Sequence, residues 1–305
     1  MNESVIHTEG LSRRFEKKQA VAEIVLDVPR GAIFGFLGQN GAGKTTTMRL
    51  LMGHLHPSSG VVRILGHDPR WLSRADRQRV AYVSENMNLP RWIRPNEALA
   101  LNASLYPNWE AVRARDLMNR FGLEEAGPFA TLSKGQKRAL CLVLALCTGA
   151  DLLILDEPAS GLDAAARRVF LDALLESNRE KECTVFLSSH LLTDLERVVD
   201  RVAILKAGRK ILDGELEELK DRARVLHLPA SAKRETVERH FRVASYRKVA
   251  EDVRATILDF HEDRLRALCA EDPAYGCVEM HGLNLEDLFV ELVTGDHIET
   301  GGVVV

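Results

Sequence analysis

The chain has 305 residues, of which 46% are hydrophobic and 28% charged, so wholesale disorder is excluded and one large domain with a smaller second one is permitted. Its formal net charge of -3 gives no electrostatic reason to expect a nucleic-acid or membrane-surface binder. The five cysteines lie at 141, 147, 183, 269 and 277 and include no C-x-x-C pair. Their odd number and their spacing disfavour a disulfide framework or a zinc site, and they fit a protein of the reducing cytosol.

Neither of two segments that could direct the chain to a membrane has the required pattern. The N-terminal residues 1–7 have no basic start and no long apolar core, so no secretion signal is expected. The longest apolar run, residues 139–147, is about half of the ~20 residues that a membrane span needs. If the protein works at a membrane, we expect another chain to supply the spans.

The N-terminal third alternates apolar segments with turns. An antiparallel β subdomain and the first core strand are expected from strands at 5–11, 20–28, 61–65 and 32–37. Residues 16–19 form a polar turn, and Phe15 just before it fits a half-buried hairpin aromatic. A helix is expected over 46–52, ending at Gly53.

Between that strand and that helix lies a glycine loop that fits the pattern G-x-x-x-x-G-K-[ST]. It comprises Gly38, Gln39, Asn40, Gly41, Ala42, Gly43, Lys44 and Thr45, and Thr46 follows. Glycines let successive backbone N–H groups point inward at a phosphate, and the helix N-terminus adds partial positive charge. Lys44 is expected to reach the β- and γ-phosphates, and the Thr45 hydroxyl to bind Mg²⁺. A chance glycine loop is the alternative.

The middle of the chain predicts a largely parallel sheet covered by helices, with a helical insertion at about 90–150. Helices are expected at 71–79, 97–105, 110–121, 134–148, 164–177 and 191–199, and strands at 80–83, 152–158, 184–190, 202–206 and 209–212. Ser133 is expected to cap the third helix of the insertion. Ligands bind at the carboxyl ends of such strands, where Glu85, Asp156, Glu157 and His190 occur.

Beyond about residue 220 the pattern changes to a small α+β domain. Strands are expected at 224–228, 255–260 and 276–281, helices at 231–241, 262–270 and 284–293, and a loose tail at 300–305. We therefore predict two domains, 1–220 and 221–305.

After the glycine loop, the adjacent carboxylates Asp156 and Glu157 are the second motif that indicates nucleotide chemistry. An acidic residue that ends an apolar strand holds Mg²⁺ in phosphate-loop NTPases, and the next carboxylate can orient the attacking water. Two exposed acids at a strand end are the alternative, which the upstream glycine loop disfavours.

Together these motifs resemble the ATP-binding subunits of ABC transporters over residues 1–220. The stretch Leu132 to Gln136 is similar to the LSGGQ signature, with Lys134 replacing a glycine, and residues 159–163 resemble the loop after Walker B. His190 matches the switch histidine, Phe15 the aromatic that stacks on adenine, and Glu85 a position usually held by glutamine. Without this match, His190 would be read as a strand-end core histidine.

The resemblance implies a P-loop NTPase cassette with ATP and Mg²⁺ as cofactors, and a head-to-tail dimer with ATP between protomers. Each ATP would contact the glycine loop of one protomer and the signature stretch of the other, which comprises Ser133, Lys134, Gly135 and Gln136. Lys44, Glu157 and His190 are the expected catalytic residues; Thr45, Glu85 and Asp156 are the expected Mg²⁺ ligands. The second cassette is a copy of this chain or a related ATPase.

The partner implied by the resemblance is a transmembrane permease, with this chain as a peripheral subunit at the cytoplasmic face of the cell membrane. No nucleic acid is expected as a partner. Residues 284–290 resemble the "LEDLF" ending of bacterial type-2 exporter ATPases. Residues 106–109 in the helical insertion also resemble that branch, so export is favoured. The competing class is a soluble ATP-driven switch, which usually carries two cassettes or a long coiled-coil insertion. A non-hydrolysing cassette is disfavoured because Lys44, Asp156, Glu157 and His190 are all present.

Overall fold

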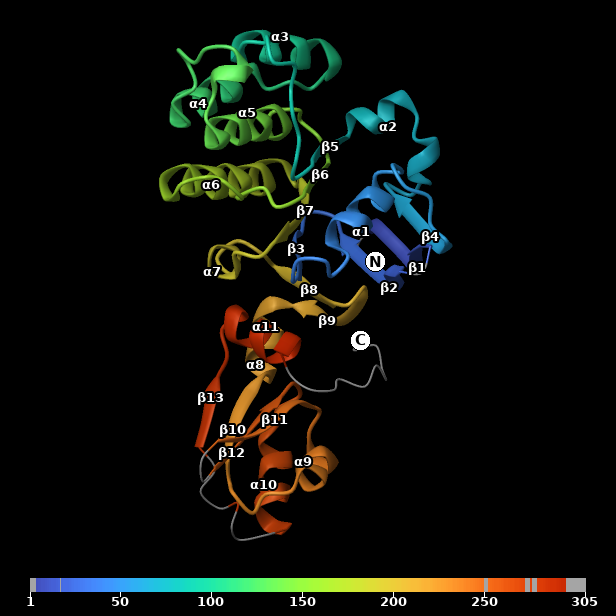
Figure 1. Cartoon of the computed structure of the whole chain (residues 1–305), viewed down its shortest axis with the longest axis vertical. Helices are drawn as coiled ribbons and strands as arrows, with labels where there is room; N and C mark the ends of the chain where they lie inside the picture. The colour runs from blue at the N-terminus through green and yellow to red at the C-terminus, as the bar shows by residue number, and fades with distance from the viewer. Residues whose placement is uncertain (1–3, 17, 250–251, 272–274, 276–278, 295–305) are drawn as a thin grey trace.

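The computed structural model describes residues 4–16, 18–249, 252–271, 275 and 279–294. Figure 1 shows an elongated molecule with a helical layer at one end, two sheets in the middle and a smaller α+β unit at the other end. Among the described residues, none of the helices is both long and apolar enough to cross a membrane.

The central sheet has six strands, of which five run parallel. In spatial order they are β5 (Val80–Val83), β6 (Leu152–Leu155), β7 (Thr184–Ser189), β3 (Ile33–Gly38), β8 (Arg201–Lys206) and β9 (Arg209–Glu215). Every residue of β3, β6 and β7 is buried, as expected for a parallel sheet covered on both faces. Only β9 is antiparallel, and it closes the edge through a hairpin with β8.

A second sheet packs against the first through a separate apolar cluster. It is antiparallel and consists of β2 (Lys18–Pro29), β1 (Ser4–Phe15) and β4 (Ser59–Ile64). Within this cluster Phe186 of β7 stacks on Phe34 of β3 and packs at a tilt against Phe36 of the same strand. The cluster also contains Met48 of helix α1 (Lys44–Leu51). The glycine loop that leads from β3 into α1 therefore starts from a rigid platform.

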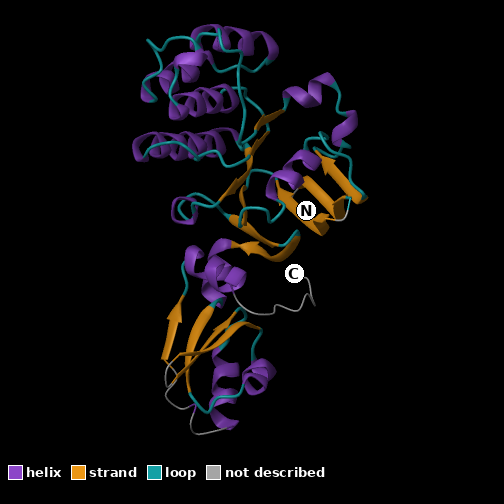
Figure 2. Cartoon of the chain, viewed as in Figure 1, coloured by secondary structure: helices purple, strands orange, loops and turns teal. Residues whose placement is uncertain are grey.

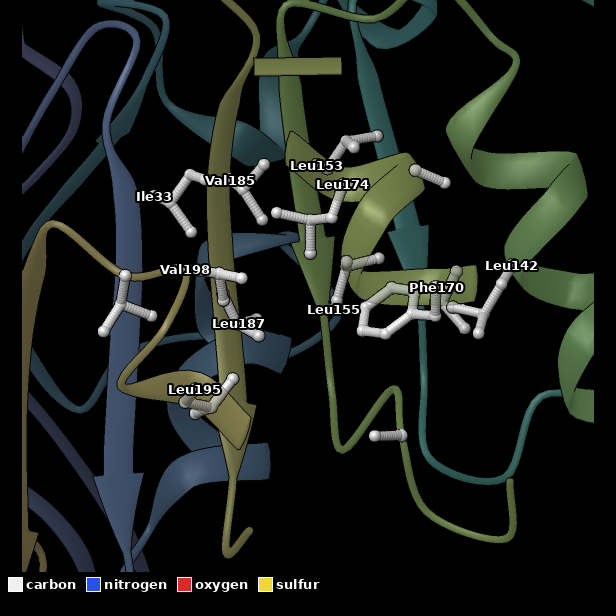
Figure 3. Close-up of a cluster of buried hydrophobic side chains, with 14 of the residues drawn as sticks. Ile33, Leu142, Leu153, Leu155, Phe170, Leu174, Val185, Leu187, Leu195 and Val198 are labelled. Atoms are coloured by element: carbon white, nitrogen blue, oxygen red, sulfur yellow. The ribbon is translucent and has the colours of Figure 1, made fainter. Parts of the chain in front are cut away.

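Helices cover the opposite face of the central sheet (Figure 2). The helices next to the sheet are α5 (Lys134–Leu146) and α6 (Ala164–Lys181), and α3 (Pro95–Leu105) and α4 (Ala111–Arg120) pack on these helices from the outside. Figure 3 shows how Leu142 of α5 and Phe170 of α6 meet Leu155 of β6 in this core. Since α5 is nearly all buried beyond its first turn, its position is fixed by packing on two sides.

The start of α5 is a capping box, which confirms Ser133 as its N-cap. The Ser133 Oγ accepts from the Gln136 N–H at 3.1 Å, and the Gln136 Oε1 accepts from the Ser133 N–H at 3.0 Å. Short elements complete the first 215 residues: η1 (Pro69–Trp71), α2 (Arg74–Gln78), η2 (Phe129–Thr131) and α7 (Leu192–Leu195).

The helix predicted over 191–199 is wrong in length, because α7 makes only about one turn. The chain leaves the helix so that Asp200 can reach the sheet, where its Oδ2 accepts from the Ile33 N–H at 2.8 Å and its carbonyl from the Leu216 N–H at 2.8 Å. Tertiary hydrogen bonds thus override helix propensity here.

The C-terminal part is a four-stranded antiparallel sheet with helices. It consists of α8 (Leu216–Arg222), β10 (Arg224–Pro229), α9 (Arg234–His240), β11 (Val243–Val249), β12 (Asp252–Ile257), α10 (Glu262–Glu271), β13 (Glu279–Gly282) and α11 (Leu285–Thr294). The strand order is β11-β12-β10-β13, and an apolar cluster of its own lies beneath it. Strand β11 was not predicted. Residues 276–278 of one predicted strand, including Cys277, and the predicted tail 300–305 lie outside the described residues.

Helix α11 joins this unit to the central domain. Its Leu285, Leu288 and Leu292 belong to the same core cluster as Leu195 of α7, while Glu291 on another face accepts from the Ser245 hydroxyl at 2.5 Å. The sequence segment that resembles the "LEDLF" ending is therefore an apolar packing helix in this fold.

Candidate functional site

The glycine loop makes a sharp turn that only glycine permits at its end. Gly43, the N-cap of α1, has φ of 109°, and a Cβ there would lie 2.5 Å from the Ala20 carbonyl oxygen. Gly41 also has positive φ, 82°. The loop can therefore pass close to β2 while the first N–H groups of α1, which lack helical partners, remain available to an anion.

A cavity of about 560 Å³ lies over this loop. Its lining comprises Phe15, Lys18, Ala20, Gln39, Asn40, Gly41, Gly43, Lys44, Thr45, Thr46, Glu85, Glu157, Ser160 and His190. Eleven of the predicted site residues are in that set. Gly38 is buried at the end of β3, where its carbonyl accepts from Lys44, and Ala42 is buried beneath the loop. The structure thus brings together residues that are up to 175 positions apart in the sequence.

Glu157 contacts both Lys44 and His190 in this cavity. The Lys44 Nζ lies 3.2 Å from the Glu157 Oε1 and donates to the Gly38 carbonyl at 2.6 Å. The other Glu157 oxygen, Oε2, is 2.6 Å from the His190 Nδ1. Lys44 and Glu157 are buried, whereas His190 is about half exposed. The three predicted catalytic side chains therefore form one connected cluster.

Asp156 lies beneath the cluster and is fully buried. The Ser188 hydroxyl donates to its Oδ1 at 2.7 Å and accepts from the Glu157 N–H at 2.9 Å. The Asp156 Oδ2 has no hydrogen-bond partner among the described residues. A buried carboxylate oxygen without a partner, with Thr45 and Glu85 lining the cavity above, is a set of oxygen donors that fits Mg²⁺.

Glu157 occupies a strained backbone conformation. Its φ of 48° lies in the left-handed region, which costs a non-glycine residue on the order of 1 kcal/mol. Hydrogen bonds on both sides of the residue hold it there: its N–H donates to Ser188, and its carbonyl accepts from Arg138 at 2.8 Å. The direction of its carboxylate is thus set by the surrounding structure.

Phe15 lies at the rim of the cavity and is 40% exposed. The guanidinium of Arg13 stacks on its ring at 4.6 Å from the centroid and donates to the His56 carbonyl at 2.7 Å. One face of Phe15 is therefore supported from behind, as a stacking platform requires.

The signature stretch 133–136 does not line this cavity. Ser133 and Lys134 are exposed at the start of α5, and the Lys134 stem packs on Gly161 in the loop that follows Glu157. A Cβ on Gly135 would lie 3.1 Å from the Gly161 carbonyl oxygen, so these two loops are in close contact.

Sequence reasoning missed five residues that the structure places at or around the site: Lys18, Ala20, Ser160, Ser188 and Arg138. Lys18 and Ser160 are near predicted residues in the chain, so local spacing could have suggested them.

Two buried side chains near the site have shifted pKa values. Arg138 is buried, and burial lowers the pKa of its guanidinium. Burial, together with the charge of Asp156, raises the pKa of the nearby Tyr82 to about 12.

Comparison with known proteins also shows similarity to ATP-binding proteins of transporters. A protein-family model described as "ABC transporter" matches residues 21–160. The bacitracin transport ATP-binding protein BcrA of Bacillus licheniformis is 30% identical over 97% of this chain and 99% of its own length. The daunorubicin/doxorubicin resistance ATP-binding protein DrrA of Streptomyces peucetius is 33% identical over 70% of this chain and 66% of its own length.

A solved structure described as the ATP-binding subunit of an ABC transporter is also similar. It has 30% sequence identity and a TM-score of 0.66, and the match covers 72% of this chain and 92% of that one. The predicted fold, a mostly parallel α/β core with an antiparallel β subdomain and a helical insertion, is thereby confirmed.

Proposed function

Because this chain belongs to the ABC transporter ATP-binding family, we propose that it binds and hydrolyses ATP to power a membrane exporter, through closure of a head-to-tail dimer. The observation that carries this proposal is the contact of Lys44, Glu157 and His190 over a glycine loop that begins a helix. The names of the relatives BcrA and DrrA, which refer to transport and drug resistance, favour export.

ATP binding follows from the shape and charge of the cavity. The N–H groups of the glycine loop and of α1 receive the phosphates, and Lys44 exchanges Glu157 for a phosphate oxygen. Phe15 stacks on the base, and Lys18 adds a second cation at the rim. Mg²⁺, held by Thr45, Asp156 and Glu85, would supply charge neutralisation of the phosphates.

The hydrolytic step uses the groups that surround the γ-phosphate. Glu157 accepts a hydrogen bond from the attacking water and orients it, because its carboxylate is fixed by the strained backbone and by His190. His190 donates to the γ-phosphate from the same side. Lys44 balances the charge that develops on the phosphate oxygens.

Dimer closure completes the site. Ser133 and Gly135 at the start of α5 offer hydrogen-bond donors and a helix N-terminus, yet they lie outside their own chain's cavity. In a head-to-tail pair they meet the γ-phosphate held by the other protomer. ATP then favours the closed dimer, since it contacts both protomers only in that state, and hydrolysis removes this bias.

The proposed function also includes a membrane partner and a location in the cell. A transmembrane permease supplies the membrane spans, and the chain lies at the cytoplasmic face of the membrane as a peripheral subunit. Residues 1–220 serve as the cassette and 221–305 as an accessory domain, supported by the separate apolar cluster under the C-terminal sheet.

Cell fractionation and a phosphate-release assay test this function. Tagged chain expressed in its own cells should sediment with membranes and, after these membranes are dissolved in detergent, bring down a multispanning protein. The purified chain should release phosphate from ATP only when Mg²⁺ is present. Recovery in the soluble or ribosomal fraction would instead favour a soluble ATP-driven switch.

A further inference from the structure

Arg138 makes an unusual set of contacts for a buried arginine. Its side chain is 7% exposed, and its guanidinium donates to backbone carbonyls rather than to carboxylates. Four carbonyl oxygens accept at 2.7–2.9 Å, those of Ser84, Asp156, Glu157 and Pro158. A fifth, that of Glu85, lies at 3.5 Å. One planar side chain thus ties down the segments that leave two neighbouring strands, β5 and β6.

These segments are the ones that carry the site. Glu85 and Glu157 line the cavity, and Asp156 lies beneath it. Burial of Arg138 lowers its pKa through loss of hydration, while the carboxylates of Asp156, Glu157 and Glu85 stabilise its charge from a distance. Arg138 does not line the cavity, so its role must act through the groups that it holds.

Arg138 also belongs to the helix that carries the signature stretch. It lies five residues after Ser133, or about 7 Å along the axis of α5. A helix transmits displacement over such a distance as a rigid body, and Gly135 adds a second contact by packing against Gly161. Movement of the helix start therefore pulls directly on the backbone of Glu157.

We infer that Arg138 is a positioning residue that couples the two ATP sites of the dimer. This inference rests on the proposed function, in which Ser133 and Gly135 meet the partner's ATP while Glu157 acts on the chain's own. ATP held by the partner fixes the position of the start of α5. Arg138 transmits this position to the carbonyls of Asp156 and Glu157 through its hydrogen bonds. The carboxylate of Glu157 then reaches the position in which it orients water. Each site is thus fully active only when the other is filled.

Steady-state hydrolysis tests the coupling. In the wild-type chain, phosphate release against ATP concentration should be sigmoidal, with a Hill coefficient between 1 and about 2 for two coupled sites. Arg138→Gln should bring the Hill coefficient to about 1 and lower kcat by about tenfold or more, whereas ATP affinity measured by calorimetry should change by less than about threefold. Arg138→Lys, which keeps the charge but not the planar fork, should lie closer to Arg138→Gln than to wild type.

Arg113→Gln is the matched control. Arg113 is another partly buried arginine, which joins α4 to α6 by donating to the Ala173 carbonyl at 2.5 Å and the Ser177 hydroxyl at 2.7 Å, away from the cavity. It should lower the melting temperature without changing the Hill coefficient. If Arg138→Gln does not fold, Arg138→Lys still tests the inference.

Three outcomes overturn the inference: a wild-type Hill coefficient of 1, wild-type cooperativity and kcat in Arg138→Lys, or equal loss of cooperativity in Arg113→Gln. Failure of the proposed function is distinguishable from these, because a wild-type chain that neither binds nor hydrolyses ATP would contradict that function before Arg138 is examined.

Discussion

The ammonium of Lys44 and the carboxylate of Glu157 lie 3.2 Å apart in a buried pair at the floor of the glycine-loop cavity. A phosphate that binds at Lys44 must replace this carboxylate, which leaves Glu157 to His190 and to water. In the proposed function, Lys44 holds phosphate and Glu157 orients water, so these two roles would be linked by competition between phosphate and Glu157 for the Lys44 ammonium.

Lys44→Ala should abolish detectable ATP binding. The truncation removes the buried cation and leaves Glu157 with His190 alone as a side-chain partner, so its charge repels incoming phosphate, which costs at least about 30-fold in affinity. Isothermal calorimetry measures the effect, with Lys248→Ala on the exposed end of β11 as the control. Intact affinity in Lys44→Ala would show that the glycine loop is not the phosphate site.

Phe15→Ala should weaken ATP affinity modestly, by about 1–3 kcal/mol, because a stacking partner for the base is lost. Arg13→Ala should give a smaller effect of about 0.5–1 kcal/mol, since Arg13 only supports the ring from behind. Phe15→Tyr preserves the ring and serves as the control in the same calorimetric series. Unchanged affinity in Phe15→Ala would return Phe15 to a purely structural role.

Glu85→Ala should raise the Mg²⁺ concentration needed for half-maximal ATPase activity. An oxygen ligand near the triphosphate is lost, whereas Glu85→Gln keeps an oxygen and should show a smaller increase. The matched control is Asn86→Ala, an exposed neighbour in the same loop. Chelation of Mg²⁺ by EDTA should stop hydrolysis in all four proteins. If Glu85→Ala left both the Mg²⁺ titration and transport unchanged, its assigned role would be wrong.

Cys141 on α5 gives a pH-dependent reporter of this region. Burial raises the pKa of its thiol from 9.0 to about 11, so the unreactive protonated form dominates at pH 8. Because the folded-state pKa is the higher one, its contribution to stability is complete below pH 9 and is lost as the pH rises toward 11.

Alkylation with iodoacetamide, read by mass spectrometry, should therefore be slow at Cys141 in the folded chain at pH 8 and fast in urea. The exposed fraction of Cys269 is larger, so its alkylation in the folded chain is the internal comparison. Equal rates for Cys141 in folded and unfolded chain would contradict its burial.

Local sequence patterns were sufficient for the parts of the site that follow one another in the chain. The strand, glycine loop and helix start around Lys44 were predictable because turn chemistry and helix capping act over a few residues. The carboxyl ends of buried strands likewise marked Asp156, Glu157 and His190. The contact among Lys44, Glu157 and His190 follows from the parallel order of β3, β6 and β7.

Arg138 could not be found in this way. Its partners are main-chain carbonyls 18 to 54 positions away, and any residue type could have supplied them. Strand β11 was missed because it lies at the edge of its sheet and its last three residues, 247–249, are all exposed, which interrupts the period-two alternation of buried and exposed residues. Helix α7 was overestimated because hydrogen bonds of Asp200 to β3 and α8 end it early.

The central claim is that ATP holds two copies of the chain together and that hydrolysis separates them. Glu157→Gln tests it directly, since the amide keeps the shape of the side chain but orients water poorly and should slow hydrolysis by about 100-fold or more. Light scattering after size exclusion, with Mg²⁺ and ATP, should give twice the 34.0 kDa mass of the chain, and return to the single mass with ADP. A Glu157→Gln chain that binds ATP yet keeps the mass of one chain at every ATP concentration would contradict the account.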